Sequence, residues 1–147
     1  MNDRLVEVRR GELLLSTDRA RVDVDRVLGW LHASHWGGSM TRALLVRAID
    51  NSLVVGVYGP AGQLGFLRVV TDITTFAYVT DVIVAEPARG RGIASWMVEA
   101  VLAHPDLQGL RRFALLTRDA RTLYEKFGFS ATDLSASTYM ELRPPRR

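Results

Sequence analysis

The chain has 147 residues, of which 48% are apolar, and it contains no cysteine. A chain of this length suits one domain that buries about 70% of the surface its unfolded form exposes, so no metal or disulfide is needed to stabilise it. The lack of cysteine excludes disulfide bonds and a cysteine nucleophile. We therefore expect a single domain over residues 1–147, with residues 143–147 as a frayed tail.

The charge balance is basic, with a net charge of +3 and an isoelectric point of about 9.8. All but one of the 19 basic residues are arginines, and they are interspersed with 16 carboxylates. Only Arg143–Arg147 forms a cluster, for which a frayed terminus is a simpler interpretation than a binding arm. A nucleic-acid-binding protein is an alternative that a gel-shift assay at two salt concentrations tests. The interspersed charges favour a protein without a nucleic acid partner.

We expect this sequence to contain neither a signal peptide nor a membrane span. Residues 1–4, Met-Asn-Asp-Arg, carry mixed charge and do not begin the apolar run of about 7–15 residues found in a signal peptide. No apolar run approaches the roughly 20 residues of a membrane span. We expect a cytoplasmic protein without a membrane partner.

The first half of the chain alternates strand and helix patterns. Gly11–Ser16 has an apolar centre and predicts a first strand. Apolar residues at helical spacing predict helices over Val24–Leu31 and over residues 41–49, the second capped by Ser39 or Thr41. A glycine-rich elbow, Ser34–Ser39, joins these two helices.

The middle of the chain is rich in residues that favour strands. Leu53–Tyr58 and Gln63–Val70 flank Gly59–Gly62, a pattern typical of an antiparallel hairpin. Phe76–Val84 predicts the next strand. A glycine-rich loop follows this strand and precedes a predicted helix that Pro105 ends.

The last part of the chain predicts a strand over Phe113–Leu116, a short helix over Ala120–Phe127 and a final strand over Ser137–Leu142. Two consecutive strand-helix-strand units should place their strands parallel in one sheet. The element order therefore predicts the α/β class, with a mixed sheet and helices on both faces.

The loop Val84–Ala94 joins a predicted strand to a predicted helix. Backbone N–H groups at the start of a helix have no intrahelical partner, and the macrodipole adds positive potential there, so an anion is stabilised at Arg89–Ala94. Gly90 and Gly92 let the backbone approach phosphate oxygens closely. The spacing fits neither a Walker A loop nor a dinucleotide fingerprint, because Ser95 replaces the third glycine of the latter. The alternative is a plain turn with two solvated arginines.

Two motifs resemble those of the GNAT N-acetyltransferase superfamily. Arg89, Gly92 and Ala94 match its signature Gln/Arg-x-x-Gly-x-Gly/Ala, and Leu123–Phe129 is similar to its Leu-Tyr-Glu-Lys-x-Gly-Phe block. The two motifs lie about 30 residues apart with a predicted strand between them, which is more specific than either alone. The resemblance implies the acyl-CoA N-acyltransferase fold, in which the central mixed sheet is mostly antiparallel.

The resemblance also implies acetyl-CoA as co-substrate. In the family the pantetheine arm lies between two strands that splay apart, and a backbone N–H polarises the thioester carbonyl; here those backbone groups belong to Ile83 and Val84. The pyrophosphate is expected at the loop. Thr117 stands where the family often has asparagine and takes that place among the expected contacts. The expected loop contacts are Arg89, Gly90, Arg91, Gly92, Ile93 and Ala94.

Two residues are expected to carry the proton transfers. A lysine-like amine is mostly protonated at pH 7, and making the neutral form costs about 4–5 kcal/mol. Asp81 is the only carboxylate inside a predicted core strand, so it is either a base, acting directly or through water, or a structural carboxylate with a partner. Thr80, expected on the opposite face, offers another way to order a water. By resemblance Tyr124 protonates the coenzyme A thiolate; a packed aromatic is the alternative.

Expected acceptor contacts are Trp36, in the elbow that often overhangs the acceptor site in this family, and Tyr78; plain packing is the alternative for both. The three histidines have no metal-ligand spacing, so we expect no metal. The expected activity is direct acetyl transfer from acetyl-CoA to a primary amine of a small molecule or peptide, by a monomer or homodimer. A non-catalytic acyl-CoA-binding module is the alternative.

Overall fold

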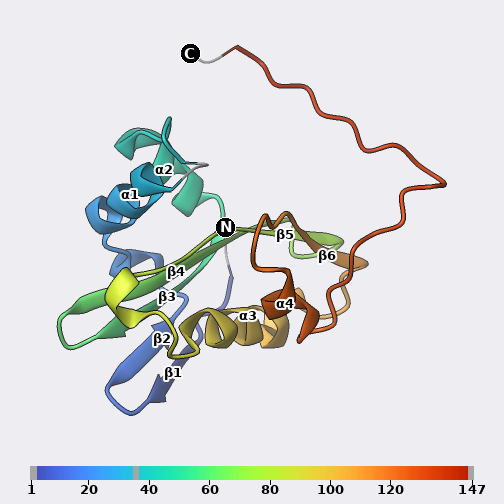
Figure 1. Cartoon of the computed structure of the whole chain (residues 1–147). Helices are drawn as coiled ribbons and strands as arrows, with labels where there is room; N and C mark the ends of the chain where they lie inside the picture. The colour runs from blue at the N-terminus through green and yellow to red at the C-terminus, as the bar shows by residue number, and fades with distance from the viewer. Residues whose placement is uncertain (1–2, 35–36, 146–147) are drawn as a thin grey trace. The chain divides into compact units, whose positions relative to one another are not determined.

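The computed structural model describes residues 3–34 and 37–145 (Figure 1). The contacts divide the chain into two compact units, and the boundary between them in the sequence lies between Leu116 and Thr117. The expectation of a single domain stays a prediction. The first unit contains a sheet, and the second contains one short helix followed by an exposed segment.

The sheet has six strands in the described residues, and they lie across it in chain order. Neighbouring strands are antiparallel except for the last two, which are parallel. The predicted mixed, mostly antiparallel sheet is therefore confirmed. The strands are β1 (Glu7–Arg10), β2 (Leu13–Ser16), β3 (Leu53–Gly59), β4 (Gly62–Thr71), β5 (Phe76–Val84) and β6 (Arg112–Leu115).

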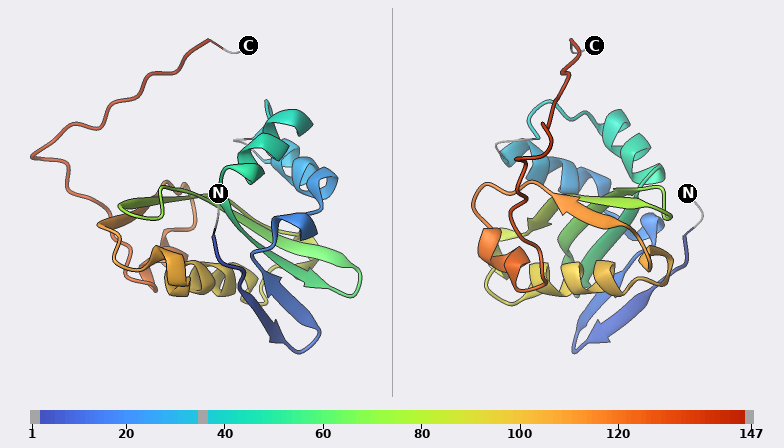
Figure 2. Two further views of the ribbon diagram at one scale, coloured as in Figure 1. Left: turned by 180° about the vertical axis from the view of Figure 1, so that it is seen from behind. Right: turned by 90° about the vertical axis from the view of Figure 1, so that its right-hand side faces the viewer.

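Helices cover both faces of this sheet (Figures 1 and 2). On one face lie α1 (Val24–Ala33) and α2 (Arg42–Asp50), and on the other lies α3 (Ile93–Ala103). Thr41 rather than Ser39 caps α2, because its side chain accepts the N–H of Leu44. Short 3-10 helices are η1 (Arg19–Arg21), η2 (Glu86–Ala88) and η3 (Pro105–Leu107), and α4 (Arg121–Glu125) belongs to the second unit.

Two sequence-based expectations about strands are wrong. The segment before Gly11 forms β1, which the sequence did not indicate because all four of its residues are exposed and show no apolar alternation. The predicted strand over Ser137–Leu142 is not a strand, and its residues are exposed. A strand needs a neighbouring strand to take its backbone hydrogen bonds, and nothing in residues 117–145 supplies one.

The α1 and α2 face holds a buried apolar cluster drawn from both helices and from β3, β4 and β5. On the opposite face α3 packs so closely against β4 that a Cβ at Gly65 would lie 3.0 Å from the Ile93 side chain and 3.2 Å from that of Met97. The cluster on the first face is Val22, Val27, Leu31, Leu45, Ile49, Val54, Phe66 and Ile83.

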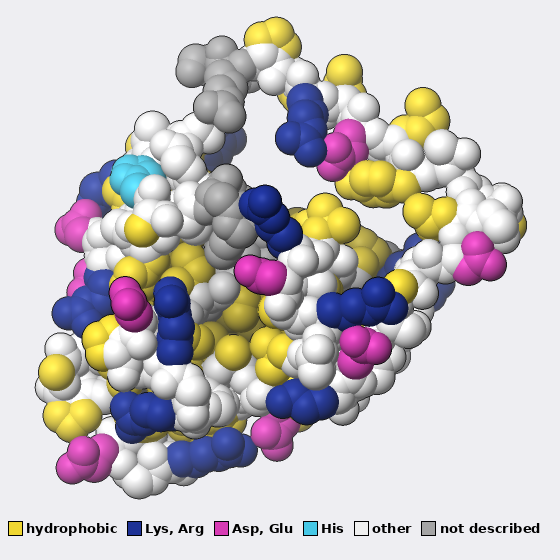
Figure 3. Space-filling model, in the orientation of Figure 1, with side chains coloured by type: hydrophobic (Ala, Val, Ile, Leu, Met, Phe, Trp, Pro, Cys, Tyr) yellow, Lys and Arg dark blue, Asp and Glu magenta, His cyan; other side chains and the backbone are white. Residues whose placement is uncertain are grey.

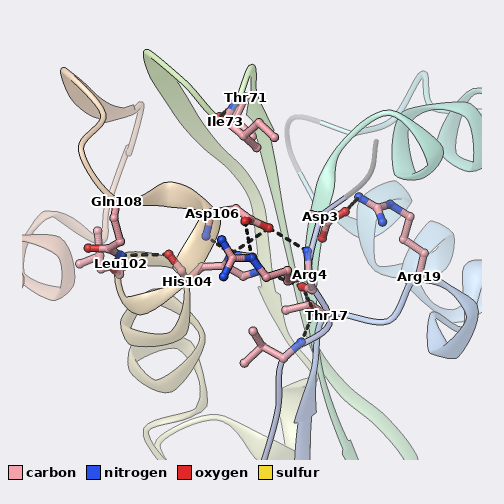
Figure 4. A network of polar contacts seen from close by, with 11 residues as sticks. Asp3, Arg4, Thr17, Arg19, Thr71, Ile73, Leu102, His104, Asp106 and Gln108 are labelled. Carbon is pink, nitrogen blue, oxygen red and sulfur yellow. Dashed lines mark hydrogen bonds and ion pairs between the residues drawn. The ribbon is translucent and has the colours of Figure 1, made fainter.

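A polar network ties the N-terminal segment to the C-terminal end of α3 (Figure 4). The Asp106 carboxylate accepts the backbone N–H of Arg4 at 2.7 Å and its Nε–H at 2.9 Å. Buried His104 accepts the Asp106 N–H at Nδ1, so its Nε2–H donates to the Arg4 carbonyl oxygen at 3.1 Å. The network anchors the chain just before β1.

Candidate active site

The predicted strand, loop and helix around Gly90 are all present. β5 ends at Val84, η2 follows, and α3 begins at Ile93 directly after the turn. Gly90 and Gly92 have φ angles of +78° and +76°, a left-handed conformation that side chains other than glycine rarely adopt. A Cβ at either position would meet no atom within 4 Å, so the two glycines leave open space above the backbone.

The turn lines a small pocket at the N-terminus of α3. The pocket has a volume of about 150 Å³. The first intrahelical hydrogen bond runs from the Trp96 N–H to the Gly92 carbonyl oxygen at 3.0 Å, so the preceding N–H groups of the first turn have no intrahelical acceptor. These groups can bind an anion. The lining residues are Val84, Ala88, Arg89, Gly90, Gly92, Ile93, Ala94 and Ser95.

The two arginines of the turn do different things. Arg89 donates from Nε to the Val84 carbonyl oxygen at 3.1 Å and so binds the turn to the end of β5. Arg91 lines a second pocket of about 460 Å³, together with the β1–β2 and β3–β4 turns. Of the expected loop residues, Arg91 is therefore the one that does not line the smaller pocket.

On the viewed face of the molecule, basic and acidic side chains are interspersed and do not form separate basic and acidic patches (Figure 3).

β5 extends beyond its neighbour β6. The two strands pair in parallel from Phe76 with Arg112 to Val79 with Leu115. The remaining five residues of β5, Thr80–Val84, have no partner on that side within the described chain. Ile83 and Val84 lie in this stretch, as the expected separation of two strands requires. Neither residue therefore pairs with β6.

Asp81 lies at a β-bulge on the face of the sheet that α1 and α2 cover. Its φ angle is +52°, and the pairing of β5 with β4 shifts register between Phe66 and Arg68. Arg68 pairs with Thr80 in register, so Thr80 shares its face, and the ion pair places Asp81 there too. The expectation that Thr80 points to the opposite face is wrong, because the bulge interrupts the alternation of side chains.

Asp81 has a partly buried partner that the sequence interpretation missed. Arg68 donates from Nε to Asp81 Oδ2 at 2.8 Å, and the two side chains are 15% and 7% exposed. Arg68 Nη1 donates to the Ser52 hydroxyl at 3.2 Å. The signal was the single basic residue inside the predicted strand Gln63–Val70, because a charge in a buried strand needs a partner.

The remaining expected site residues lie elsewhere. Tyr78 is half-buried on β5, between Val70 of β4 and Ala114 of β6. Trp36 lies outside the described residues. Within residues 3–34 and 37–145, no group of three His, Asp or Glu side chains is placed to hold a metal ion. Over the same ranges no helix has the length and apolarity to cross a membrane.

Tyr124 and Thr117 belong to the second unit. Tyr124 is buried on α4, and this burial raises the pKa of its hydroxyl above the ordinary value. Its ring meets that of Phe129 edge to face, with centroids 6.0 Å apart. The Thr117 hydroxyl accepts the Ala120 N–H at 3.0 Å, just before α4 begins.

Comparisons with known proteins agree on one family. Residues 45–131 match the profile of the acetyltransferase (GNAT) domain. A protein of Gibberella zeae named as an acetyltransferase is 33% identical over 140 residues, which cover 80% of this chain and 78% of that protein.

Solved structures are similar as well. A crystal structure from Xanthomonas campestris, assigned to the GNAT family, is 41% identical with a TM-score of 0.85, covering 90% of this chain and 94% of that one. A Clostridium acetobutylicum acetyltransferase solved with acetyl-CoA is 17% identical with a TM-score of 0.63, covering 89% and 94%. At that identity the second likeness concerns the fold alone.

Proposed function

The chain belongs to the GNAT acetyltransferases, and we propose that it transfers the acetyl group of acetyl-CoA to a primary amine of a small molecule or protein. The amine attacks the thioester directly, without an acyl-enzyme. The observation that carries the proposal is the continuity of β5 with the glycine turn. Among the described residues Thr80–Val84 has no partner strand on the β6 side, and the strand then leads into a helix N-terminus of the kind that binds anions.

The turn suits the pyrophosphate of coenzyme A. Left-handed Gly90 and Gly92 keep side chains away from the backbone, and the first N–H groups of α3 face the anion. The pantetheine amides lie along the free edge of β5, where backbone groups replace the missing strand. A backbone N–H of Ile83 or Val84 polarises the thioester carbonyl and stabilises the developing oxyanion. Thr117 is proposed as a further contact to the donor.

Asp81 is the proposed base. It precedes Val84 by three residues, or about 10 Å along a strand. Its Oδ2 is held by Arg68, while Oδ1 has no hydrogen-bond partner among the described residues. Oδ1 takes the proton from the acceptor ammonium, directly or through a water, and so supplies the neutral amine. Tyr78 and Trp36 are the proposed acceptor contacts, the latter on the sequence alone.

Tyr124 is the proposed acid. As the carbon–nitrogen bond forms and the carbon–sulfur bond breaks, the leaving thiolate needs a proton, which the phenol supplies. Its raised pKa keeps the hydroxyl protonated at neutral pH. The cycle balances, because the acceptor loses one proton, the sulfur gains one, and solvent resets both groups.

The test follows thiol release from acetyl-CoA with a panel of amines, including amino acids, polyamines, aminoglycosides and peptides. We expect release above background with at least one amine and formation of its N-acetyl derivative by mass spectrometry. Binding of acetyl-CoA without turnover on any amine would favour a non-catalytic acyl-CoA-binding module. Absence of both binding and turnover would contradict the proposal altogether.

A further inference from the structure

We propose that Arg68 is a positioning residue for acetyl transfer, which holds Asp81 so that its Oδ1 faces the acceptor amine. The inference rests on the proposed role of Asp81 as base. It concerns a residue that touches neither substrate and acts through the carboxylate that it binds.

The Arg68 guanidinium is divided between two partners. A structural arginine often binds a carboxylate with two parallel hydrogen bonds, one to each oxygen. Here Arg68 Nε donates a hydrogen bond to Asp81 Oδ2 at 2.8 Å, but Nη1 donates to the Ser52 hydroxyl oxygen at 3.2 Å. The division fixes one carboxylate oxygen and leaves Oδ1 without a partner among the described residues. Arg68 thus orients the carboxylate while leaving one oxygen able to accept a proton.

The backbone conformation at Asp81 also needs contacts from other residues to maintain it. Its φ angle of +52° lies in the left-handed region, which aspartate tolerates better than most residues but which persists only when the surroundings determine it. The bulge places Thr80 and Asp81 on one face of the sheet and breaks the pairing with Leu67. The ion pair spans the bulge, with the Arg68 and Asp81 side chains 15% and 7% exposed, and so contributes to holding this conformation.

Ser52 completes the chain of contacts. Ser52 lies between α2 and β3 and is 2% exposed, and its hydroxyl oxygen accepts a hydrogen bond from Arg68. Its carbonyl oxygen accepts a hydrogen bond from a different arginine, Arg19, which also binds Asp3 and the Ile49 carbonyl oxygen. Arg19 and Asp3 therefore form a comparable ion pair, with side chains 23% and 2% exposed, that does not itself contact Asp81 and reaches it only through Ser52 and Arg68. Arg19→Lys is the control for the loss of an ion pair in this region.

The experiment is a double-mutant cycle in the full chain, using an amine that the panel identifies. Arg68→Met, Arg68→Lys, Ser52→Ala and Asp81→Asn are each measured at saturating acetyl-CoA and amine, and each of the first three is also combined with Asp81→Asn. We expect Arg68→Met to lower kcat by about 10- to 100-fold, since a misplacement of about 1 Å has an effect of that size. Arg68→Lys restores part of the loss, and the KM for acetyl-CoA stays unchanged.

Non-additivity is the decisive result. In the Asp81→Asn background the Arg68 and Ser52 substitutions should cause no further loss of kcat. At raised pH the kcat of Asp81→Asn should recover in part. The kcat of the single Arg68 variants should recover in the same way, which a general loss of structure would not produce. Circular dichroism and thermal melting identify variants that fail to fold; Ser52→Ala, the mildest change, then carries the test with a several-fold loss.

Three outcomes would overturn the assignment. Additive losses would mean that Arg68 acts independently of Asp81, while an equal loss of kcat in Arg19→Lys would mean that any buried ion pair in this region has the same effect. An active protein in which Asp81→Asn has wild-type rates would remove the residue through which Arg68 acts. A wild type that fails to release thiol with every amine of the panel would instead contradict the proposed function, and this inference with it.

Discussion

The side chain of Arg89 folds back onto Val84, with Nε donating to the carbonyl oxygen at 3.1 Å. The turn between β5 and α3 is thereby closed by its own arginine. Anion binding at this turn then depends on backbone N–H groups and on the left-handed glycines rather than on a free guanidinium at position 89. Changes to the backbone conformation of the turn should therefore impair donor binding most.

The first prediction concerns Gly92. Gly92→Val forces a β-branched residue into a φ of +76°, so the turn must rearrange and its N–H groups lose their common direction. Coenzyme A at 100 times its dissociation constant should stabilise the wild type by about 2.7 kcal/mol. We expect the corresponding rise in melting temperature to be absent in the variant.

Gly109→Val is the matched control for this substitution. Gly109 has a φ of +77° and open space at its Cβ position, as Gly92 does, but it lies beyond η3 and lines neither pocket described above. The control should lose stability through the same backbone strain and still respond to coenzyme A. A full response in Gly92→Val would mean that the turn does not hold the pyrophosphate.

The second prediction concerns Asp81 and pH. Asp81→Asn keeps the size of the side chain but removes its ability to accept a proton, so the rate at neutral pH should fall. As pH rises toward the amine pKa, free amine becomes abundant and the deficit should shrink. The rate of each protein is measured from pH 6 to 10. Parallel profiles with equal rates would leave Asp81 a structural role only.

Much of the fold follows from local patterns in the sequence. The helix starting near Val24, the hairpin around Gly59–Gly62 and the strand Phe76–Val84 combine a clear period with turn or cap residues, and the structure contains each of them. Ser137–Leu142 is also predicted as a strand from its local sequence, but it has no neighbouring strand in its unit. Local sequence indicates that a segment can form a strand, while the partner strand is a property of the whole fold.

The candidate site also combines features that local sequence predicts with features that depend on the whole fold. The glycine turn is local, and all of the expected loop residues except Arg91 line the pocket beside it. The Arg68–Asp81 pair depends on the register of β4 against β5 and on a bulge, neither of which a single strand encodes. A charged residue in a buried strand signals that a partner exists but not which residue it is.

The third prediction concerns stability in acid. Hydrogen bonds from Arg4, chiefly from its backbone N–H, hold the pKa of Asp106 below the ordinary value for aspartate. A lowered pKa means that the charged carboxylate stabilises the folded state above the unfolded pKa of about 3.9, and that this contribution is lost as pH falls through the folded value. Asp106→Asn should therefore be less stable than wild type at pH 7.

The difference between the two proteins should narrow below about pH 4, where the wild type loses the same contribution. Urea unfolding at pH 7 and at pH 3 measures it. Asp25→Asn is the control, because Asp25 and its partner Arg42 are 77% and 61% exposed and such surface pairs contribute little. If the difference in unfolding free energy between wild type and Asp106→Asn stays constant with pH, the Asp106 charge is not what anchors the N-terminal segment.

The last prediction concerns Tyr124. Tyr124→Phe keeps the ring and its edge contact with Phe129 but removes the proton, so stability and acetyl-CoA affinity should barely change. Turnover should fall by roughly 10²–10⁴-fold if thiolate departure contributes to the barrier. Burial raises the Tyr124 pKa, and an acid works only while protonated, so the wild-type rate should show no loss from this group around neutral pH. If affinity collapses while turnover at saturation survives, the hydroxyl is a binding contact and another group protonates the sulfur.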